Sequence, residues 1–267
     1  MATPSVSNAS KGYPVLPELV PPEALERGAY RMRFARDAAD LDSVLRLRYE
    51  VFNLELGEGL DASNETGRDR DAFDETCHHL MVEDASSGRL VGTYRMQTAE
   101  MAARAGGFYS AGEFHLDELP VDIVGRAMEV GRACVAQDFR NRQVLFLLWK
   151  GLALYLTHNR KRYLFGCCSL TSQDTAEGIR AFRQLEAGGH LHPELWVSPR
   201  AGLECAVADG GTAGEGEVRI PILFSTYLRY GAKVCGPPAI DREFKTIDFL
   251  VVLDVEALEP EFRRMYF

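Results

Sequence analysis

The chain has 267 residues, of which 46% are hydrophobic and 26% are charged, and its formal net charge is −9. These values are typical of a soluble globular protein that can bury a large core. The negative charge argues against a nucleic-acid-binding protein, whose surface should be dominated by basic residues. The longest apolar stretch, residues 144–156, is too short to span a bilayer and contains Lys150, although contact with a membrane surface remains compatible with the sequence.

The N-terminus and the cysteines both favour a protein of the cytoplasm. Residues 1–24 are rich in proline and serine and lack the regions of a signal peptide, so we expect a flexible arm over residues 1–28. The six cysteines show no C-x-x-C spacing, which favours reduced thiols over a zinc site. The histidine pairs at 78–79 and at 190 and 192 lack a third ligand, so no metal site is predicted. Residues 29–267 are expected to form one domain with a C-terminal extension.

The apolar pattern predicts alternating strands and helices along the chain. The expected strands cover residues 31–35, 79–84, 90–97, 126–136, 163–168, 232–235 and 246–254. The expected helices cover residues 41–54, 143–159, 175–185 and 221–230. The segments 57–71, 99–125 and 187–218 are expected to be irregular, with at most a short strand near 195–197. This order implies an α/β fold with a mixed sheet and helices on both faces.

The strand expected over residues 126–136 contains two charged residues, Glu129 and Arg132, in an otherwise apolar run. Charges inside a buried strand are costly unless they are paired or take part in chemistry. The alternation of side chains along a strand predicts that Glu129 and Gly131 lie on one face and Arg132 on the other. These two charged residues are therefore candidates for a functional site.

Further charged groups precede this strand. Arg48 and Phe52 are four residues apart and share one face of a predicted helix. Asp71 and Asp74 bring two carboxylates close together, and Arg95 ends the second of two adjacent strands. With the charged strand, they form a constellation that a purely structural protein does not require.

This constellation resembles the charged signature of the acyl-homoserine-lactone synthases, a branch of the Gcn5-related N-acyltransferase fold. The signature, R-x-x-x-F, D-x-x-D, a strand-borne R and E-x-x-R, falls on Arg48, Phe52, Asp71, Asp74, Arg95, Glu129 and Arg132. The sequence is more similar to the ornithine N-acyltransferases of ornithine-lipid biosynthesis, sometimes labelled hemolysin-like. The shared motifs, between residues 30 and 255, are RYxVF, DxFD, VGTYR, GxFYSxxEF, ExGR, LLWKGLA, YLFGC and GAxVCGPPAxDxxF.

The resemblance implies a Gcn5-related N-acyltransferase fold with a mixed, mostly antiparallel twisted sheet. It implies a cytoplasmic enzyme, able to contact the inner face of the membrane, that moves a long 3-hydroxylated acyl chain to the α-amine of ornithine. The product would be lyso-ornithine lipid, and the donor would be the acyl-phosphopantetheine of acyl carrier protein, with no resident cofactor. Another amino acid, a homoserine-lactone-type acceptor or a non-catalytic acyl-binding protein remains an open alternative.

The turn after the charged strand favours acyl carrier protein as the donor. Acetyltransferases that use coenzyme A carry R-x-x-G-x-G/A here, and the backbone N–H groups of this turn bind the pyrophosphate. Residues 140–143 of this chain read RNRQ, without glycine, so a donor with a single phosphodiester fits better. Carrier proteins of this kind are acidic and need a basic docking surface. We expect that surface to comprise Arg140 and Arg142, with Arg160, Lys161 and Arg162.

Aminolysis of a thioester requires a neutral amine and hydrogen-bond donors for the developing oxyanion. An α-amine has a pKa of about 8 and a lysine-like amine one of about 10.4, so the α-amine is easier to deprotonate by about 3 kcal/mol. The catalytic candidates are Glu129 and Arg132. Glu129 is the expected general base, directly or through a water, and a structural ion pair with Arg95 or Arg132 is the alternative.

The other candidates each have two interpretations. Asp71 and Asp74 either bind the cations of the amino acid or pair with Arg48. Arg132 is expected mainly to hold the sheet in shape, with direct substrate contact as the alternative. The aromatic residues that belong either to the core or to an acyl tunnel are Phe108, Tyr109, Phe146 and Trp149.

Overall fold

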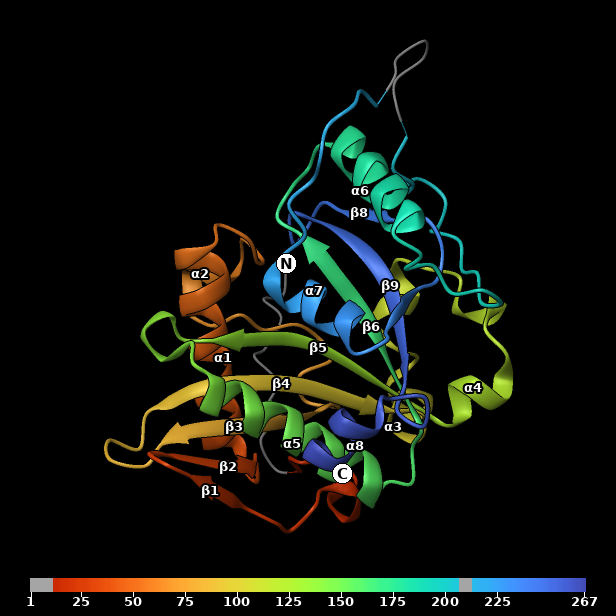
Figure 1. The fold of residues 1–267 in the computed structure, drawn as a ribbon. Coiled ribbons are helices and arrows are strands. Elements are labelled where there is room, and N and C mark those ends of the chain that lie inside the picture. Colours follow the sequence, from red (N-terminus) through yellow and green to blue (C-terminus); the bar gives the residue numbers. More distant parts are fainter. Residues whose placement is uncertain (1–11, 207–212) are drawn as a thin grey trace.

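The computed structural model describes residues 12–206 and 213–267. Its centre is a nine-stranded sheet in the order β1-β2-β3-β4-β5-β6-β9-β7, with β8 also paired to β9 (Figure 1). The strands are β1 (Leu25–Arg27), β2 (Tyr30–Phe34), β3 (His78–Asp84), β4 (Leu90–Thr98), β5 (Ala127–Val135), β6 (Tyr163–Leu170), β7 (Lys233–Val234), β8 (Ala239–Asp241) and β9 (Thr246–Asp254). Neighbouring strands are antiparallel except for β5 and β6, which are parallel.

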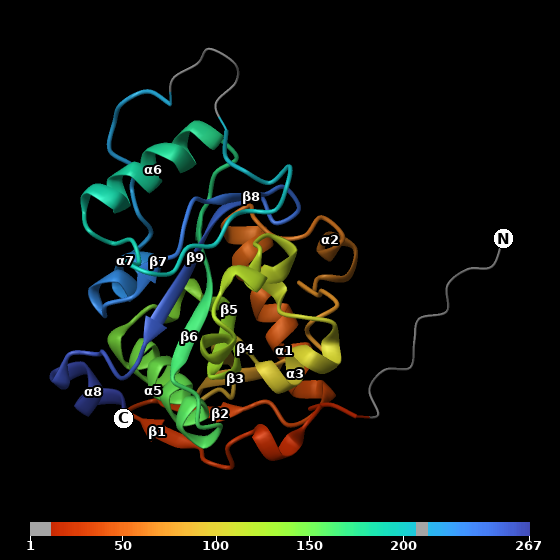
Figure 2. The same ribbon diagram turned by 90° about the vertical axis from the view of Figure 1, so that its right-hand side faces the viewer.

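Helices cover both faces of this sheet (Figure 2). One face carries α5 (Arg142–His158), α6 (Thr175–Ala187), α7 (Ile222–Arg229) and α8 (Pro260–Tyr266). The other face carries α1 (Ala38–Tyr49), α2 (Ser63–Thr66) and α3 (Ala99–Ala105), and the short α4 (Val121–Gly125) precedes β5. The mixed, mostly antiparallel sheet with helices on both faces is thereby confirmed. Within the described ranges, no helix combines the length and apolarity that crossing a membrane requires.

The long helix α5 packs closely on the sheet and fixes the turn that precedes it. A Cβ atom on Gly151 would lie 2.5 Å from Leu80 Cδ1 of β3, so only glycine allows this approach. At the start of the helix, Asn141 Oδ1 accepts hydrogen bonds from the backbone N–H groups of Gln143 and Val144. This is a typical N-cap, and it determines where α5 begins after β5.

Most strongly periodic elements lie within two residues of their expected bounds. The helix expected over 41–54 begins earlier, at Ala38, and continues from Glu50 to Glu55 as a π-helical turn. The short elements β1, β8, α2, α3, α4 and α8 are too brief to show a period, and the pattern missed them. Residues 195–197 form no strand, and part of the irregular segment 187–218 lies outside the described residues.

The N-terminal segment differs from the expected arm. Residues 1–11 lie outside the described residues, but residues 12–28 pack against the sheet. The Tyr13 hydroxyl lies 2.8 Å from His79 Nδ1, the Val15 carbonyl lies 2.6 Å from His78 Nε2, and Val20 is buried. Because β1 pairs with β2, the boundary expected after residue 28 falls inside the sheet.

His78 makes the stability of the fold sensitive to acid. Its Nε2 donates to the Val15 carbonyl and its Nδ1 accepts from the Tyr155 hydroxyl at 2.6 Å, which fits a neutral ring. Burial lowers the pKa of His78 to about 4, whereas the unfolded chain takes up this proton near pH 6.5. Acidification from pH 6.5 to 4 should therefore remove about 3 kcal/mol of stability through this residue.

The measurement is urea unfolding of the natural protein and of His78→Gln between pH 7 and pH 4. The variant should lose less stability on acidification, and His115→Gln, at a partly exposed position, is the matched control. An unchanged pH dependence in His78→Gln would contradict the assignment.

Candidate active site

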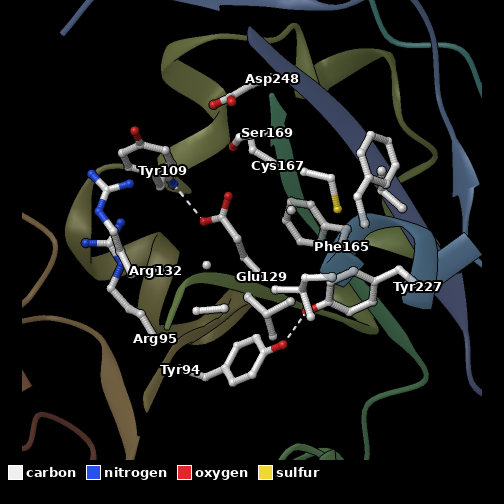
Figure 3. A pocket seen from close by; sticks show the side chains of 18 of the residues that line it. Tyr94, Arg95, Tyr109, Glu129, Arg132, Phe165, Cys167, Ser169, Tyr227 and Asp248 are labelled. Carbon is white, nitrogen blue, oxygen red and sulfur yellow. Dashed lines mark hydrogen bonds between the residues drawn. The ribbon is translucent and has the colours of Figure 1, made fainter. Parts of the chain in front are cut away.

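A cavity of about 330 Å³ lies where β5 and β6 separate (Figure 3). The two strands pair only from Ala127 to Glu129 and from Tyr163 to Phe165. Beyond this point both strands line the cavity, and helix α7 contributes apolar side chains. The volume falls within the range of small-molecule binding sites.

Gly166 stands at the point of separation and sets its geometry. Its φ is 159°, and a Cβ atom there would lie 2.2 Å from the Val130 carbonyl oxygen. Gly166→Ala should therefore push β5 and β6 apart and destabilise the protein by about 2–3 kcal/mol. Thermal unfolding measures the loss, and Gly125→Ala, whose Cβ would meet no atom within 4 Å, is the control. Equal effects of the two substitutions would contradict the close approach.

The cavity has an apolar part and a polar part. The apolar part is lined by side chains from β6, α7 and β9, including Phe165, Phe224 and Tyr227. Tyr227 is fixed there by a 2.6 Å hydrogen bond between its hydroxyl and that of Tyr94. In Figure 3 the charged side chains gather on the opposite side, around Glu129. Such a cavity can hold an apolar chain next to a polar reaction centre.

Arg48 and Asp74 form a buried ion pair and do not reach the cavity. Arg48 Nη1 and Nη2 donate to the two oxygens of Asp74 at 2.5 and 3.3 Å, and Arg48 Nε donates to Asp69 at 2.7 Å. All three side chains are completely buried. Burial opposes the charge of Asp74, but Arg48, His79 and Arg95 hold its pKa well below the usual range. The prediction that Arg48 and Asp74 contact the substrate is therefore wrong. The alternative interpretation, in which Asp74 pairs with Arg48, is what the structure shows.

Arg95 connects this buried pair with the cavity. Its Nη1 donates to both oxygens of Asp71 at 2.6 and 2.7 Å and to Asp74 Oδ1 at 3.0 Å. Arg95 lines the cavity, as Phe52 does, whereas Asp71 does not. Burial opposes the charge of Asp71, yet Arg95 and Arg132 keep its pKa low. Asp71 thus pairs with arginines in the structure.

Arg132 lies on the same side of the sheet as Glu129, against the expected alternation. The β4–β5 register shifts between Thr93 and Arg95, so that one residue of β4 faces Arg132 and its neighbour Ala133. Arg132 has a left-handed backbone, φ 48°, which is typical of a strained β-bulge position. The bulge redirects its guanidinium into the cavity, where it lies 4.0 Å from the Phe244 ring centre and 3.3 Å from Asp71.

Glu129 is held by hydrogen bonds rather than by an ion pair. Its carboxylate accepts from the backbone N–H of Tyr109, from the backbone N–H of Ser110 and from the Ser110 hydroxyl, at 2.8, 2.8 and 2.5 Å. Among the described residues, no arginine lies within 4.0 Å of it, so the alternative of an ion pair with Arg95 or Arg132 is wrong. Burial raises the pKa of Glu129, and the Ser110 contacts oppose this rise.

Several acidic residues near the cavity had not been predicted as site residues. Asp248 of β9 and Glu58 line it, and Glu113 follows the 3₁₀ turn Tyr109–Gly112. We call Glu113 and Asp248 the acid pair. Burial raises the pKa of both carboxyl groups; Asp248 and Asp241 raise that of Glu113 further, and Asp241 adds to the rise at Asp248. Glu113 belongs to the GxFYSxxEF motif, which could have identified it, whereas nothing in the pattern around Asp248 marks a site.

Of the four aromatic residues considered for an acyl tunnel, one lines the cavity. Tyr109 lines the cavity, with its ring 4.7 Å from the Arg132 guanidinium carbon. Phe108 packs on Phe165, while Phe146 and Trp149 pack near the C-terminus against Tyr266. These three belong to the core.

The five basic residues expected at the docking surface do not form one patch. Arg140, which pairs with Glu55 at 2.7 Å, and Arg142 lie at the start of α5. The other three follow the end of this 17-residue helix, about 25 Å away. There Lys161 is nearly buried against Glu100, and Arg162 pairs with Asp254. Only the first two remain candidates for contact with the donor.

The separated parallel strands and the cavity between them define an acyltransferase of the Gcn5-related type. A family model described as an acetyltransferase (GNAT) domain matches residues 47–150. A solved structure of FeeM, an N-acyl amino acid synthase from uncultured soil microbes, is 11% identical, covers 86% of this chain and 94% of its own, and gives a TM-score of 0.48.

Curated relatives define the family more narrowly. The L-ornithine N(alpha)-acyltransferase of Rhizobium meliloti (strain 1021) is 32% identical over 88% of this chain and 83% of its own. That of Rhodobacter capsulatus is also 32% identical, over 89% of this chain and 95% of its own. The chain belongs to the L-ornithine N(alpha)-acyltransferase family, and it is an enzyme that transfers acyl groups.

Proposed function

We propose that this enzyme transfers a long 3-hydroxyacyl chain from acyl carrier protein to the α-amine of ornithine. The observation that carries the proposal is the similarity to L-ornithine N(alpha)-acyltransferases over nearly nine tenths of the chain. The product is an acylated amino acid, the lyso form of an ornithine lipid. The acyl group arrives on its donor, so the reaction requires no resident cofactor.

The start of α5 supports a carrier protein as the donor. In this position the free N–H groups of a helix can bind a pyrophosphate, but Asn141 already occupies those of Gln143 and Val144. A phosphopantetheine arm carries one phosphodiester and needs fewer such donors. Arg140 and Arg142 beside this turn provide positive charge for an acidic carrier protein.

The cavity supports a direct attack of the amine on the thioester. Glu129 lies between the polar and apolar parts of the cavity and accepts the proton of the α-ammonium, directly or through a water. Backbone N–H groups between Val130 and Arg132, where β5 has left β6, stabilise the oxyanion. Arg132, directed inward by the bulge, attracts the α-carboxylate of the amino acid.

Exposed apolar residues near the cavity support a place at the membrane surface. Leu56 lines the cavity and is 41% exposed, and Ile222, next to the lining residues Pro221 and Leu223, is 78% exposed. An amphiphilic product would leave the cavity past these side chains. Contact with the inner face of the membrane would remove their apolar surface from water.

The test is acyl transfer by the purified full-length protein, followed by mass spectrometry. 3-Hydroxyacyl carrier protein and the matching acyl-coenzyme A are each offered with ornithine, glycine, lysine or homoserine lactone. We expect an α-amide of ornithine, formed mainly with the carrier protein. Equal efficiency with coenzyme A would contradict the choice of donor, and a δ-amide or another preferred acceptor would contradict the choice of acceptor.

A further inference from the structure

We propose that Glu113 and Asp248, the acid pair, bind the δ-ammonium group of ornithine and thereby select a diamino acid as acceptor. This inference rests on the function proposed above. In this inference the acid pair binds the amine that does not react, while the candidate base, Glu129, acts on the amine that does.

Asp248 lines the same cavity as Glu129, and Glu113 lies next to Asp248. Asp248 lies opposite Ser169 in the β6–β9 ladder, and both side chains line the cavity (Figure 3). Carboxylate oxygens of Glu113 and Asp248 lie within 4.8 Å of each other and of Cys167 Sγ. One ammonium group placed between the two carboxylates can donate to both of them.

One oxygen of each carboxyl group in the acid pair has no hydrogen-bond partner among the described residues. Asp248 is 3% exposed and Glu113 7%, and neither Asp248 Oδ1 nor Glu113 Oε1 accepts a hydrogen bond from the described residues. An unpaired buried carboxylate is costly, because burial removes its hydration without replacement. Asp248, which lines the cavity, and Glu113 beside it are therefore suited to a cation that arrives with the substrate.

The protein offers no cation of its own to the acid pair. Arg95 and Arg132, on the other side of the cavity, and Arg48 behind them are paired with Asp69, Asp71 and Asp74. In the described ranges no lysine or arginine lies within 4.0 Å of Glu113 or Asp248. A cationic side chain that enters the cavity would therefore supply the charge that the acid pair does not receive from an ion pair within the protein.

One short turn relates the acid pair to the candidate base. Glu129 binds the N–H groups at the start of the turn Tyr109–Gly112, and Glu113 follows directly at its end. Three residues of a 3₁₀ helix, from Ser110 to Glu113, advance the chain by about 6 Å. The two amines of ornithine are five bonds apart, which is also about 6 Å when extended. Along the backbone, the turn thus separates Ser110, which binds the carboxylate of Glu129, from Glu113 by about the length of ornithine.

An ammonium group fits this site better than a metal ion. The third candidate ligand, Cys167, has a half-buried thiol whose pKa is raised well above its ordinary value by loss of hydration, so it stays protonated. A protonated thiol is a poor metal ligand, and no histidine joins the group. A metal remains a distinct outcome of the test below.

The experiment compares ornithine with norvaline, which lacks only the δ-amine, using the same acyl donor and full-length enzyme. The variants are Asp248→Asn and Glu113→Gln, and the exposed Asp117→Asn is the matched control. We expect kcat/KM for ornithine to exceed that for norvaline by about 100-fold in the natural protein. Each acid-pair variant should lose most of this preference while its kcat/KM for norvaline changes less than about threefold.

Both acid-pair variants should keep or raise the midpoint of thermal unfolding, because each removes a carboxyl group whose charge burial disfavours. Equal losses for both acceptors, or a natural protein that does not favour ornithine over norvaline, would overturn the inference. So would an ornithine preference that disappears after dialysis against a chelator and returns with a divalent metal. Failure to acylate any amino acid would instead overturn the proposed function, and the inference with it.

Discussion

Arg48→Met is expected to lower the free energy of unfolding by about 3–5 kcal/mol. The guanidinium of Arg48 is completely buried and binds two equally buried carboxylates, those of Asp69 and Asp74. Methionine has a similar shape but no charge, so it would leave Asp69 without its shortest hydrogen bond. A buried charge without a partner costs more than the pair contributes, which explains the expected size of the loss. Equilibrium unfolding in urea measures it.

The matched control is Arg46→Met, two residues away on the same helix. Arg46 is mostly exposed and pairs with Asp42 at 2.8 Å, so its loss should cost less than about 1 kcal/mol. Arg48→Lys should recover only part of the lost free energy of unfolding, because the lysine ammonium lacks the planar array of donors with which a guanidinium binds two carboxylates. If Arg48→Met and Arg46→Met were equally mild, the buried cluster would not contribute as described.

The elements that frame the site could be predicted from the sequence because each follows one regular period. The alternating and apolar runs of β3, β4, β5 and β9, and the apolar face of α5, fix their type and approximate bounds. The order of charged residues was also sufficient to indicate an acyltransferase. The regular spacing of apolar residues does not predict which way a side chain points where a strand or helix is irregular.

Arg132 illustrates this limit. Strict alternation directs it away from Glu129, but a bulge in the β4–β5 ladder returns it to the same side. A bulge depends on how two strands register against each other, which a single strand does not reveal. The acid pair illustrates another limit, since Glu113 follows an irregular segment and Asp248 lies in the last strand. Only the folded protein brings their carboxyl groups together.

Glu129→Gln is expected to lower kcat for acyl transfer by about 10²–10⁴-fold, with a smaller change in the KM values. Glutamine has nearly the same shape but cannot take a proton from the α-ammonium group. Glu129 now accepts hydrogen bonds from three donor groups. The amide nitrogen of glutamine, itself a donor, would face at least one of them, so some loss of stability is expected. Initial rates with saturating donor and ornithine measure the effect, and unchanged transfer would show that Glu129 is not the base.

Loss of activity in Glu129→Gln alone would not separate a base from a residue that only positions the turn Tyr109–Gly112. Ser110→Ala makes this distinction, because it removes one hydrogen bond to the carboxylate and keeps the carboxylate itself. The Ser110 contacts oppose the rise in the pKa of Glu129 that burial causes, so their partial loss should raise that pKa further. If Glu129 is the base, the acidic limb of the kcat/KM profile must move to higher pH, while the rate at high pH is largely retained. A uniform decrease at every pH, without displacement of this limb, would mean that Glu129 acts only through the position of the turn.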